Sequence, residues 1–416
     1  MYDQYNIDKF KYTKMYNYYV GKTDIDKYTK TDRSNNKIND NFVKTFIDEE
    51  VSFMVGAPIT YSSLNVDVIN DINYNLSNAC IDTKLANNML IFGEAYEFYY
   101  LNSDGDFSVK VFNPLNSYCY EDTEEKAQLF MYFYKKDLDE KIYIEVIDDE
   151  FIYHLDDSFN QIENPTPHIF KHVPVGIAKL ANGLEDTIYA SIKSLQDAYE
   201  ILLSDWSNEI SDTRLAYLMF TGGEVDEKSA KLMKELGIIQ SPEPNAKVEY
   251  IVKNINSDFY NTYRNLLKED IYRAAQHIDN QTQVQSNTSG SMLATRLNCL
   301  RIKITTQNQS LVFCIKERIK NLFIYLSATQ NKLYDFKEIQ IKPQLNLPKN
   351  DVEVAQIISQ LNGKISTRTA IEQLSFITNG QAEYDKMLEE EKLRNEADPN
   401  LVSLDRLNDE EESKVI

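Results

Sequence analysis

Residues 188–206 read Ile-Tyr-Ala-Ser-Ile-Lys-Ser-Leu-Gln-Asp-Ala-Tyr-Glu-Ile-Leu-Leu-Ser-Asp-Trp, and they carry the most regular pattern in the chain. Apolar side chains recur at alternating spacings of four and three residues, at Ile188, Ile192, Leu195, Tyr199, Leu202 and Trp206. This spacing predicts a long amphipathic helix over about 185–211. Its apolar seam is of the kind that helices pack against neighbouring helices.

A second long helix is predicted over about 257–279. Its apolar positions are Phe259, Tyr263, Leu266, Leu267, Ile271 and Ala274. The segment 213–255 between the two helices is short, mixed in character and punctuated by Gly222-Gly223 and by Ser241-Pro-Glu-Pro244. Two long helices that bracket a small insert predict a stalk with a tip.

The second helix is followed by a polar stretch, 280–291, that reads Asn-Gln-Thr-Gln-Val-Gln-Ser-Asn-Thr-Ser-Gly-Ser. It has no charge and almost no apolar residue, so we expect an exposed loop. Beyond it the pattern is helical from Met292 to about Ala328. Later expected elements are a strand over Ile339–Leu345, helices over 351–361 and 367–374 with Asn362-Gly363 as a cap between them, and a charge-dense helix from Glu383 that leads into a disordered acidic tail.

The N-terminal part combines helices with a β-rich block. A helix is expected over 36–55, ended by Gly56 and Pro58, and two more over 65–75 and 78–92. The block 94–172 has the two-residue periodicity of strands. Its expected strands are Glu94–Leu101 and Phe107–Phe112 around an Asp104-Gly105 turn, Gln128–Tyr134 and Lys141–Ile147 as a second hairpin, and Phe151–Leu155 as an edge strand.

Composition limits the class of protein. The chain has 416 residues, which suggests two or three lobes, and 42% hydrophobic residues, which can form a core. We expect no membrane span and no secretory signal, because apolar runs are short. The cysteines are few and scattered, so free thiols in a reducing cytosol are expected at Cys80, Cys119, Cys299 and Cys314. The net charge of −21 argues against tight DNA binding but not against a conduit along which DNA slides.

The sequence contains no recognisable nucleotide-binding, metal-binding or catalytic motif. Gly21-Lys22-Thr23 lacks the upstream glycine of a phosphate-binding loop, because that position is Tyr16. The turn at Ser103–Asp106 does not have the register of a calcium loop. The histidines at 154, 168 and 172 do not form a metal-ligand pattern, and His277 stands alone on a predicted helix. No carboxylate pair stands out from the acidic background. We therefore expect no enzyme activity, no metal and no cofactor.

Several segments, in order along the chain, resemble the portal proteins of tailed phages, of the siphophage, SPP1-like family. These segments are Tyr18-Tyr-Val-Gly21, Asn35-Asn-Lys-Ile-Asn-Asp-Asn-Phe-Val-Lys44, Phe53-Met-Val-Gly-Ala-Pro-Ile-Thr-Tyr61, Ser194-Leu-Gln-Asp-Ala-Tyr199 with Leu203-Ser-Asp205, Thr288-Ser-Gly-Ser-Met-Leu-Ala294, Leu347-Pro-Lys-Asn-Asp351 and Leu361-Asn-Gly-Lys-Ile-Ser366. No single match is specific, but the ordered set from about residue 18 to about residue 395 is.

The resemblance implies a mostly helical α+β portal fold with long stem helices, a β-rich wing and a small α/β clip. It implies wing 1–185, stem helices 186–212 and 256–279, clip 213–255, tunnel loop 280–291, long wing helix and strand 292–349, crown 350–397, and the acidic tail 398–416. The site residues that follow are the loop residues Asn280, Gln281, Thr282, Gln283, Gln285, Ser286, Asn287 and Thr288, the stem residues Arg264, Lys268, Glu269 and Arg273, and the clip residues Glu224, Asp226, Glu227 and Lys228.

The implied function is a ring, usually a dodecamer, at one capsid vertex of the virion, assembled in the host cytoplasm. Double-stranded DNA would pass through it. Other partners would be the terminase large subunit, the head-to-tail connector, the scaffolding protein and the major capsid protein. An acidic wall that repels phosphates suits such a channel, and a ring would supply neighbours to the helical seam. The alternatives are an acidic helical scaffold or adaptor that never contacts DNA and, with less support, an enzyme.

Overall fold

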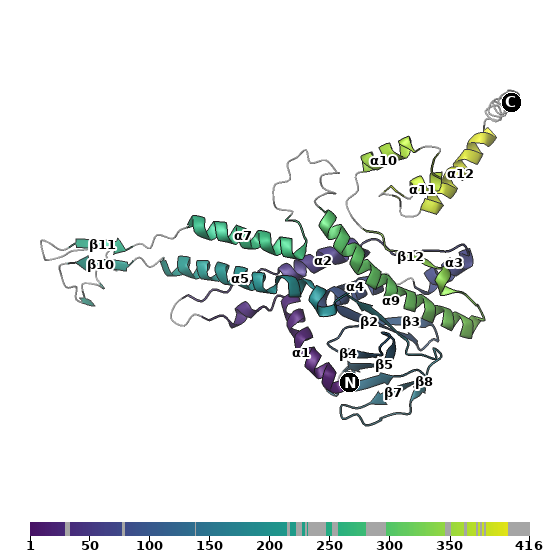
Figure 1. Cartoon of the computed structure of the whole chain (residues 1–416), viewed down its shortest axis with the longest axis horizontal. Helices are drawn as coiled ribbons and strands as arrows, with labels where there is room; N and C mark the ends of the chain where they lie inside the picture. Colours follow the sequence, from purple (N-terminus) through teal and green to yellow (C-terminus); the bar gives the residue numbers. More distant parts are fainter. Residues whose placement is uncertain are drawn as a thin grey trace. The chain divides into compact units, whose positions relative to one another are not determined.

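The computed structural model describes two compact units, drawn in Figure 1. The first comprises Met1–Gln283 and Leu297–Asn346, and the described helices after Leu347 belong to the second. The structure describes all residues except 30–33, 77–79, 138, 214–216, 222–226, 229–230, 232–246, 252–256, 280–296, 346–350, 362–363, 372, 375–376, 378–379 and 398–416.

The first unit is built around strand β2 (Glu94–Leu101), which is buried over most of its length. It pairs antiparallel with β3 (Phe107–Phe112) on one side and with β9 (Val175–Lys179) on the other. A second antiparallel sheet has the strand order β4-β5-β6-β7-β8. Its strands are Ser117–Glu121, Ala127–Tyr134, Tyr143–Ile147, Phe151–Leu155 and Thr166–Pro167. Aromatic and aliphatic side chains from both sheets, including Tyr96, Phe98, Phe112, Phe130 and Ile147, form one buried cluster.

Helices cover the first sheet and complete the core. These are α1 (Tyr2–Tyr19), α2 (Phe42–Val55), α3 (Val66–Asn75), α4 (Cys80–Phe92) and α9 (Asn298–Gln330). Helix α9 contacts β9 and β2, and it is held so closely that Gly176 of β9 has no room for a side chain: an added Cβ would lie 2.9 Å from Cys314 Sγ. A small sheet pairs β1 (Thr60–Ser62) with β12 (Gln340–Lys342). Elements far apart in the sequence therefore share one core.

The second unit contains α10 (Asp351–Gln360), α11 (Thr367–Ile371) and α12 (Gly380–Ala397), of which α11 packs against α12. The predicted helices over 351–361 and 367–374 are thereby confirmed as elements, and the charge-dense helix starts three residues earlier than expected. The Asn362-Gly363 cap and the tail 398–416 lie outside the described residues. No helix in the described part of the chain is long and apolar enough to cross a membrane.

The two predicted hairpins are confirmed, and Gly105 has the positive φ, +82°, that its turn requires. Three predictions need correction. Strand β7 is not an edge strand, because β8 pairs with it. The strand expected over 339–345 is only three residues long. The helix expected over 36–55 begins at Phe42, since Asn41 caps it through a hydrogen bond from the Lys44 backbone N–H (3.1 Å).

Candidate functional site

Two long helices, α5 (Ile188–Thr213) and α7 (Ser257–Ala275), run side by side away from the sheets (Figure 1). Trp206 of α5 stacks on Tyr260 of α7, with ring centroids 5.5 Å apart and planes within 7°. Arg264 donates a hydrogen bond from Nε to the Tyr199 hydroxyl (3.2 Å). Between them in the chain, β10 (Tyr217–Thr221) and β11 (Lys247–Ile251) form an antiparallel hairpin. The prediction of two helices that bracket a small insert is confirmed.

Part of the seam of α5 packs within the chain, so no neighbouring subunit is needed to cover that part, whereas Leu195, Leu202 and Trp206 are half-buried. Ile188, Ile192 and Tyr199 are buried, and the Tyr199 ring meets the Phe42 ring of α2 edge-on at 5.3 Å. The exposed apolar side chains of the helix pair lie elsewhere, chiefly on α7. They are Phe259 (62% exposed), Tyr263 (40%) and Leu266 (51%), spaced by four and three residues and hence on one face of the helix.

A second face of α5 is polar and buried, and it holds the segment that precedes α2. The backbone N–H of every second residue in this segment donates to a side chain of α5, and successive acceptors lie one turn apart on that helix. The pairs are Ser34 to Asp212 Oδ1 (3.1 Å), Asn36 to Asn208 Oδ1 (2.6 Å), Ile38 to Ser204 Oγ (2.9 Å) and Asp40 to Glu200 Oε1 (3.4 Å). Two extended residues advance about 6.6 Å and four helical residues about 6 Å, so the spacings match. We call these four pairs the α5 ladder.

The α5 ladder explains why residues 36–41 are not helical. The backbone N–H groups of Asn36, Ile38 and Asp40 donate to α5 side chains instead of to a preceding helical turn. Glu200 is the ladder residue nearest the start of α5, and its Oε2 accepts a hydrogen bond from the Thr23 hydroxyl (2.5 Å). Burial raises the pKa of the Glu200 carboxyl. The Thr of Gly21-Lys22-Thr23 is therefore buried and engaged in structure, in agreement with our rejection of a phosphate loop.

A buried charge cluster lies at the base of α7 and corrects the expectation that His277 stands alone on a helix. Helix α7 ends at Ala275, and the His277 ring is held between Glu49 (Nδ1 to Oε2, 2.7 Å) and Glu50 (Nε2 to Oε1, 3.0 Å) of α2. Glu50 is fully buried and also binds Lys303 Nζ (2.7 Å) and Gln307 Nε2 (2.9 Å) of α9. We call these five residues the Glu50 cluster.

The cluster shifts the pKa values of Glu50 and His277. Burial alone would raise the pKa of Glu50, but Lys303 and His277 outweigh burial and hold that pKa below its usual range. Burial alone would lower the pKa of His277, but hydrogen bonds to Glu49 and Glu50 outweigh it and raise that pKa. Both the carboxylate and the imidazolium are therefore stabilised in their charged forms.

A second buried ion pair on α9 lies farther along the helix. Arg318, 2% exposed, binds both carboxylate oxygens of Glu97 on β2, with Nε 2.9 Å from Oε2, and its Nη1 lies 2.7 Å from Asp82 of α4. Three acidic residues, Glu50, Glu97 and Glu200, are thus fully buried and stand out from the acidic background. A signal existed at Glu50, which interrupts an apolar stripe of α2 between Phe46 and Met54.

The structure describes the predicted stem residues but only part of the predicted clip residues and none of the loop. The loop 280–291 lies outside the described residues, as do Glu224 and Asp226, whereas Glu227 and Lys228 are described and exposed. Of the predicted stem residues, Arg264 and Lys268 are half-buried; Lys268 pairs with Asp279 at 2.7 Å. Arg273 is exposed and pairs with Asp270 (2.6 Å), and Glu269 is also exposed.

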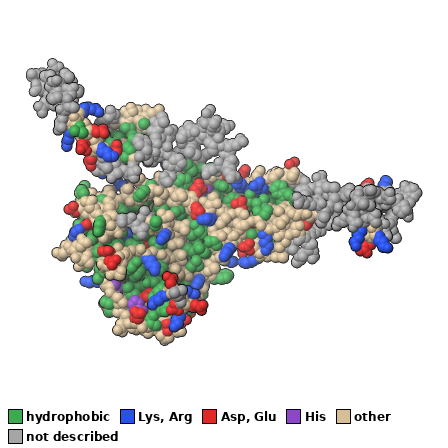
Figure 2. Space-filling view, turned by 180° about the vertical axis from the view of Figure 1, so that it is seen from behind, with side chains coloured by type: hydrophobic (Ala, Val, Ile, Leu, Met, Phe, Trp, Pro, Cys, Tyr) green, Lys and Arg blue, Asp and Glu red, His purple; other side chains and the backbone are tan. Residues whose placement is uncertain are grey.

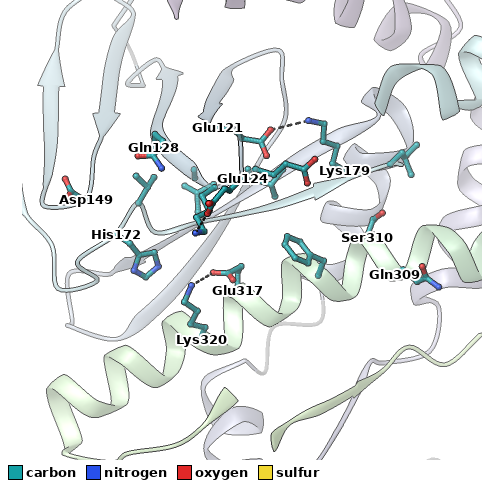
Figure 3. Close-up of a pocket in the computed structure, with 18 of the residues that line it drawn as sticks. Glu121, Glu124, Gln128, Asp149, His172, Lys179, Gln309, Ser310, Glu317 and Lys320 are labelled. Atoms are coloured by element: carbon teal, nitrogen blue, oxygen red, sulfur yellow. Dashed lines mark hydrogen bonds and ion pairs between the residues drawn. The ribbon is translucent and has the colours of Figure 1, made fainter. Parts of the chain in front are cut away.

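A cavity of about 920 Å³ lies between the sheets and α9 (Figure 3). Its wall carries two ion pairs, Glu121–Lys179 (3.2 Å) and Glu317–Lys320 (2.9 Å). Burial lowers the pKa of His172, which points toward this space (Figure 3). Opposite charges are likewise interspersed over the face in Figure 2 rather than gathered into one basic patch. The cavity thus offers mixed polar contacts and no nucleophile–base pair among the residues that line it.

The remaining candidate groups behave as ordinary structural residues. His154 pairs with Glu145 (2.6 Å), and His168 and His172 contact backbone carbonyls, so the three histidines do not converge. In the described ranges, no group of three or more potential ligands is arranged to hold a metal ion. Cys119, Cys299 and Cys314 are free thiols, and burial raises the pKa of the Cys119 and Cys314 thiols.

Comparison with known proteins gives matches along nearly the whole chain. A family model described as phage portal protein, SPP1 Gp6-like, matches residues 2–397. The portal protein of Clostridium phage phiCD119 is 22% identical over 400 residues, covering 87% of this chain and 86% of its own. The portal protein of Bacillus phage SPP1 is 23% identical over 431 residues, covering 92% and 84%. A chain from the neck of an empty gene transfer agent (GTA) particle shares the fold, with a TM-score of 0.50, 12% identity, and coverage of 78% of this chain and 87% of its own.

Proposed function

Because the chain belongs to the family of SPP1 Gp6-like phage portal proteins, we propose that it forms a closed ring at one capsid vertex, through which double-stranded DNA enters and leaves the head. The observation that carries this proposal is the family match over residues 2–397. The ring has about twelve copies, as is usual for the family that the sequence resembles. Helices α5 and α7 form its stem, the segment 213–255 its clip, and the loop 280–291 the part nearest the DNA.

The exposed apolar face of α7 supports the ring. Phe259, Tyr263 and Leu266 present a stripe that the same chain leaves largely uncovered, and a neighbouring subunit would bury it. A ring closes only when every subunit presents such a face to the next one. This exposed face supports a stem contact made chiefly by α7.

The composition supports a channel that does not hold DNA tightly. The net charge of −21 opposes the phosphate contacts on which tight binding depends, and tight binding would slow the passage of DNA. The channel loop is polar and uncharged, so its contacts with the duplex are weak and easily exchanged. The ring itself needs no nucleotide site; a separate terminase supplies ATP hydrolysis.

The partners follow from this position in the particle. The clip docks the terminase large subunit before packaging and the head-to-tail connector afterwards. The wing, residues 1–185 and 292–349, meets the scaffolding and major capsid proteins. The exposed pair Glu227 and Lys228 lies in the clip, where a partner can reach it. Charge reversal at Glu224, Asp226 and Glu227 should weaken partner binding and leave the ring intact. Unchanged binding of both partners after replacement of the whole clip would refute this assignment.

The ring is tested by native mass spectrometry and by electron microscopy of the purified full-length chain. We expect a closed ring near twelve copies with a central hole; eleven or thirteen copies would still agree with it. Leu266→Asp should shift the population toward smaller species. Leu333→Asp, at a residue 83% exposed on the segment after α9, is the matched control and should not. A chain that stays monomeric at every protein and salt concentration would contradict the proposal.

A further inference from the structure

The Glu50 cluster joins the chain on both sides of the proposed channel loop to one buried carboxylate. His277 precedes the loop and Lys303 follows it, and both bind Glu50 Oε1, at 3.0 and 2.7 Å. Lys303 also donates to the Ala275 carbonyl (3.0 Å), so the end of α7 and the first turns of α9 are linked directly. His277, which precedes the loop, and Lys303, which follows it, are therefore held at the same carboxylate of α2.

The geometry specifies the protonation state of His277. Each ring nitrogen lies within 3.0 Å of a carboxylate oxygen, and an ionised carboxylate can only accept hydrogen bonds. Both nitrogens must then carry a proton, which makes the ring an imidazolium. Two carboxylates, one imidazolium and one ammonium give the cluster no net charge. Phe46 stacks on the ring with centroids 4.4 Å apart and fixes its plane.

Other charged groups near the cluster come from the same elements. On the α7 side, Lys268 and Asp279 neutralise each other at 2.7 Å. Tyr272, which contacts Phe46, has its pKa raised to about 12 by burial and by nearby carboxylates that include Asp279 and Glu49. It stays protonated at neutral pH, so His277 is the group whose charge changes nearest to neutral pH.

We infer that His277, as an imidazolium, is a positioning residue that holds the chain leading from α7 into the proposed channel loop against α2. The inference rests on the proposed function only for the role of the loop. When His277 loses its second proton, one of its two hydrogen bonds is lost and Glu49 and Glu50 keep a net negative charge. The attachment of the α7 end to α2 is then weakened, while the Lys303 contact remains.

The sign of the pH dependence follows from the raised pKa of His277. The contact of His277 with Glu49 and Glu50 is complete below the ordinary histidine pKa. It is lost as the pH rises through the raised pKa of His277. The ion pair Arg318–Glu97 contains no histidine. Glu97, like Glu50, is fully buried and bound by a cation of α9, but it joins α9 to β2. It is therefore a matched control for burial without a link to the loop.

The experiment is hydrogen–deuterium exchange of the unmodified full-length chain between about pH 6 and about pH 9, with each rate divided by its intrinsic rate. Protection at residues 271–277 should fall about tenfold or more as the pH rises, as expected for the loss of one charge-assisted hydrogen bond. Protection near Arg318 should stay constant. In His277→Gln the protection of 271–277 should be low at both pH values.

Two results would overturn the inference. One is protection of 271–277 in the unmodified chain that does not change with pH. The other is a loss of protection at these residues in Glu97→Gln as large as in Glu50→Gln. The measurement needs neither DNA nor a capsid, so its failure removes the inference and leaves the proposed function untouched. A failed ring or channel test would conversely leave the exchange result intact.

Discussion

Replacing Asn208 by alanine should release the segment 34–40 from α5. Asn208 is 2% exposed and makes two contacts with Asn36: Oδ1 accepts the backbone N–H (2.6 Å), and Nδ2 donates to the carbonyl (3.3 Å). Each neutral hydrogen bond contributes about 1 kcal/mol, so Asn208→Ala should cost about 2 kcal/mol. Ser204→Ala removes the single bond to the Ile38 N–H and should cost about 1 kcal/mol.

The assay is amide exchange at Asn36 and Ile38 in the native chain. A cost of about 2 kcal/mol corresponds to roughly thirtyfold faster exchange at Asn36, and about 1 kcal/mol to roughly fivefold at Ile38. Ser194→Ala, at an exposed position of the same helix, controls for a general effect on α5. The α5 ladder would be refuted by equal exchange at both amides in all three variants, or by Ser194→Ala matching Asn208→Ala.

Three further outcomes follow from the packing around α9. Gly176→Ala would place a methyl group against the Tyr99 hydroxyl, and we expect urea denaturation to show a loss of about 1–3 kcal/mol. Arg318→Met leaves Glu97 buried without its cation and should cost about 3–5 kcal/mol in thermal or urea unfolding; adding Glu97→Gln should recover part of this loss, and no recovery would contradict the pairing. The stability that His277 contributes, measured as the difference from His277→Gln, should be largest near about pH 6 and shrink as the pH rises, because its folded-state pKa is raised.

Elements with strong periodicity could be predicted from the sequence. The seam of α5 lies where its spacing of four and three residues placed it. The strands around Asp104-Gly105 could be predicted from the turn between two runs of strand-forming residues, although β2 is buried on both faces. Helix α1 was missed because its buried side chains are mainly tyrosines on a tyrosine-rich helix, so no apolar stripe stands out. Strand β9 was missed because it is a short run buried on both faces, without alternation.

The site could be predicted less well, for a physical reason. The apolar pattern of residues 36–41 continues the stripe of α2 and so predicts a helix. The backbone N–H groups of Asn36 and Ile38 instead donate to side chains of α5, which lie more than 160 residues away in the sequence. Likewise, Glu50 is tolerated in an apolar stripe only because His277 and Lys303 reach it; His277 is 227 positions along the chain. Local patterns report burial, whereas the satisfaction of a buried polar group depends on distant residues.

The dependence of the first unit on α9 has a consequence for biosynthesis. Strand β2 is complete at Leu101, but α9, which supplies Arg318 to Glu97, ends at Gln330. At about 5–20 residues per second, the ribosome takes roughly 10–50 s to cross that interval. During this time Glu97 in the nascent sheet lacks its partner Arg318, and the face of the sheet that α9 will cover has no helix packed against it. The first unit therefore completes its core only after translation of α9.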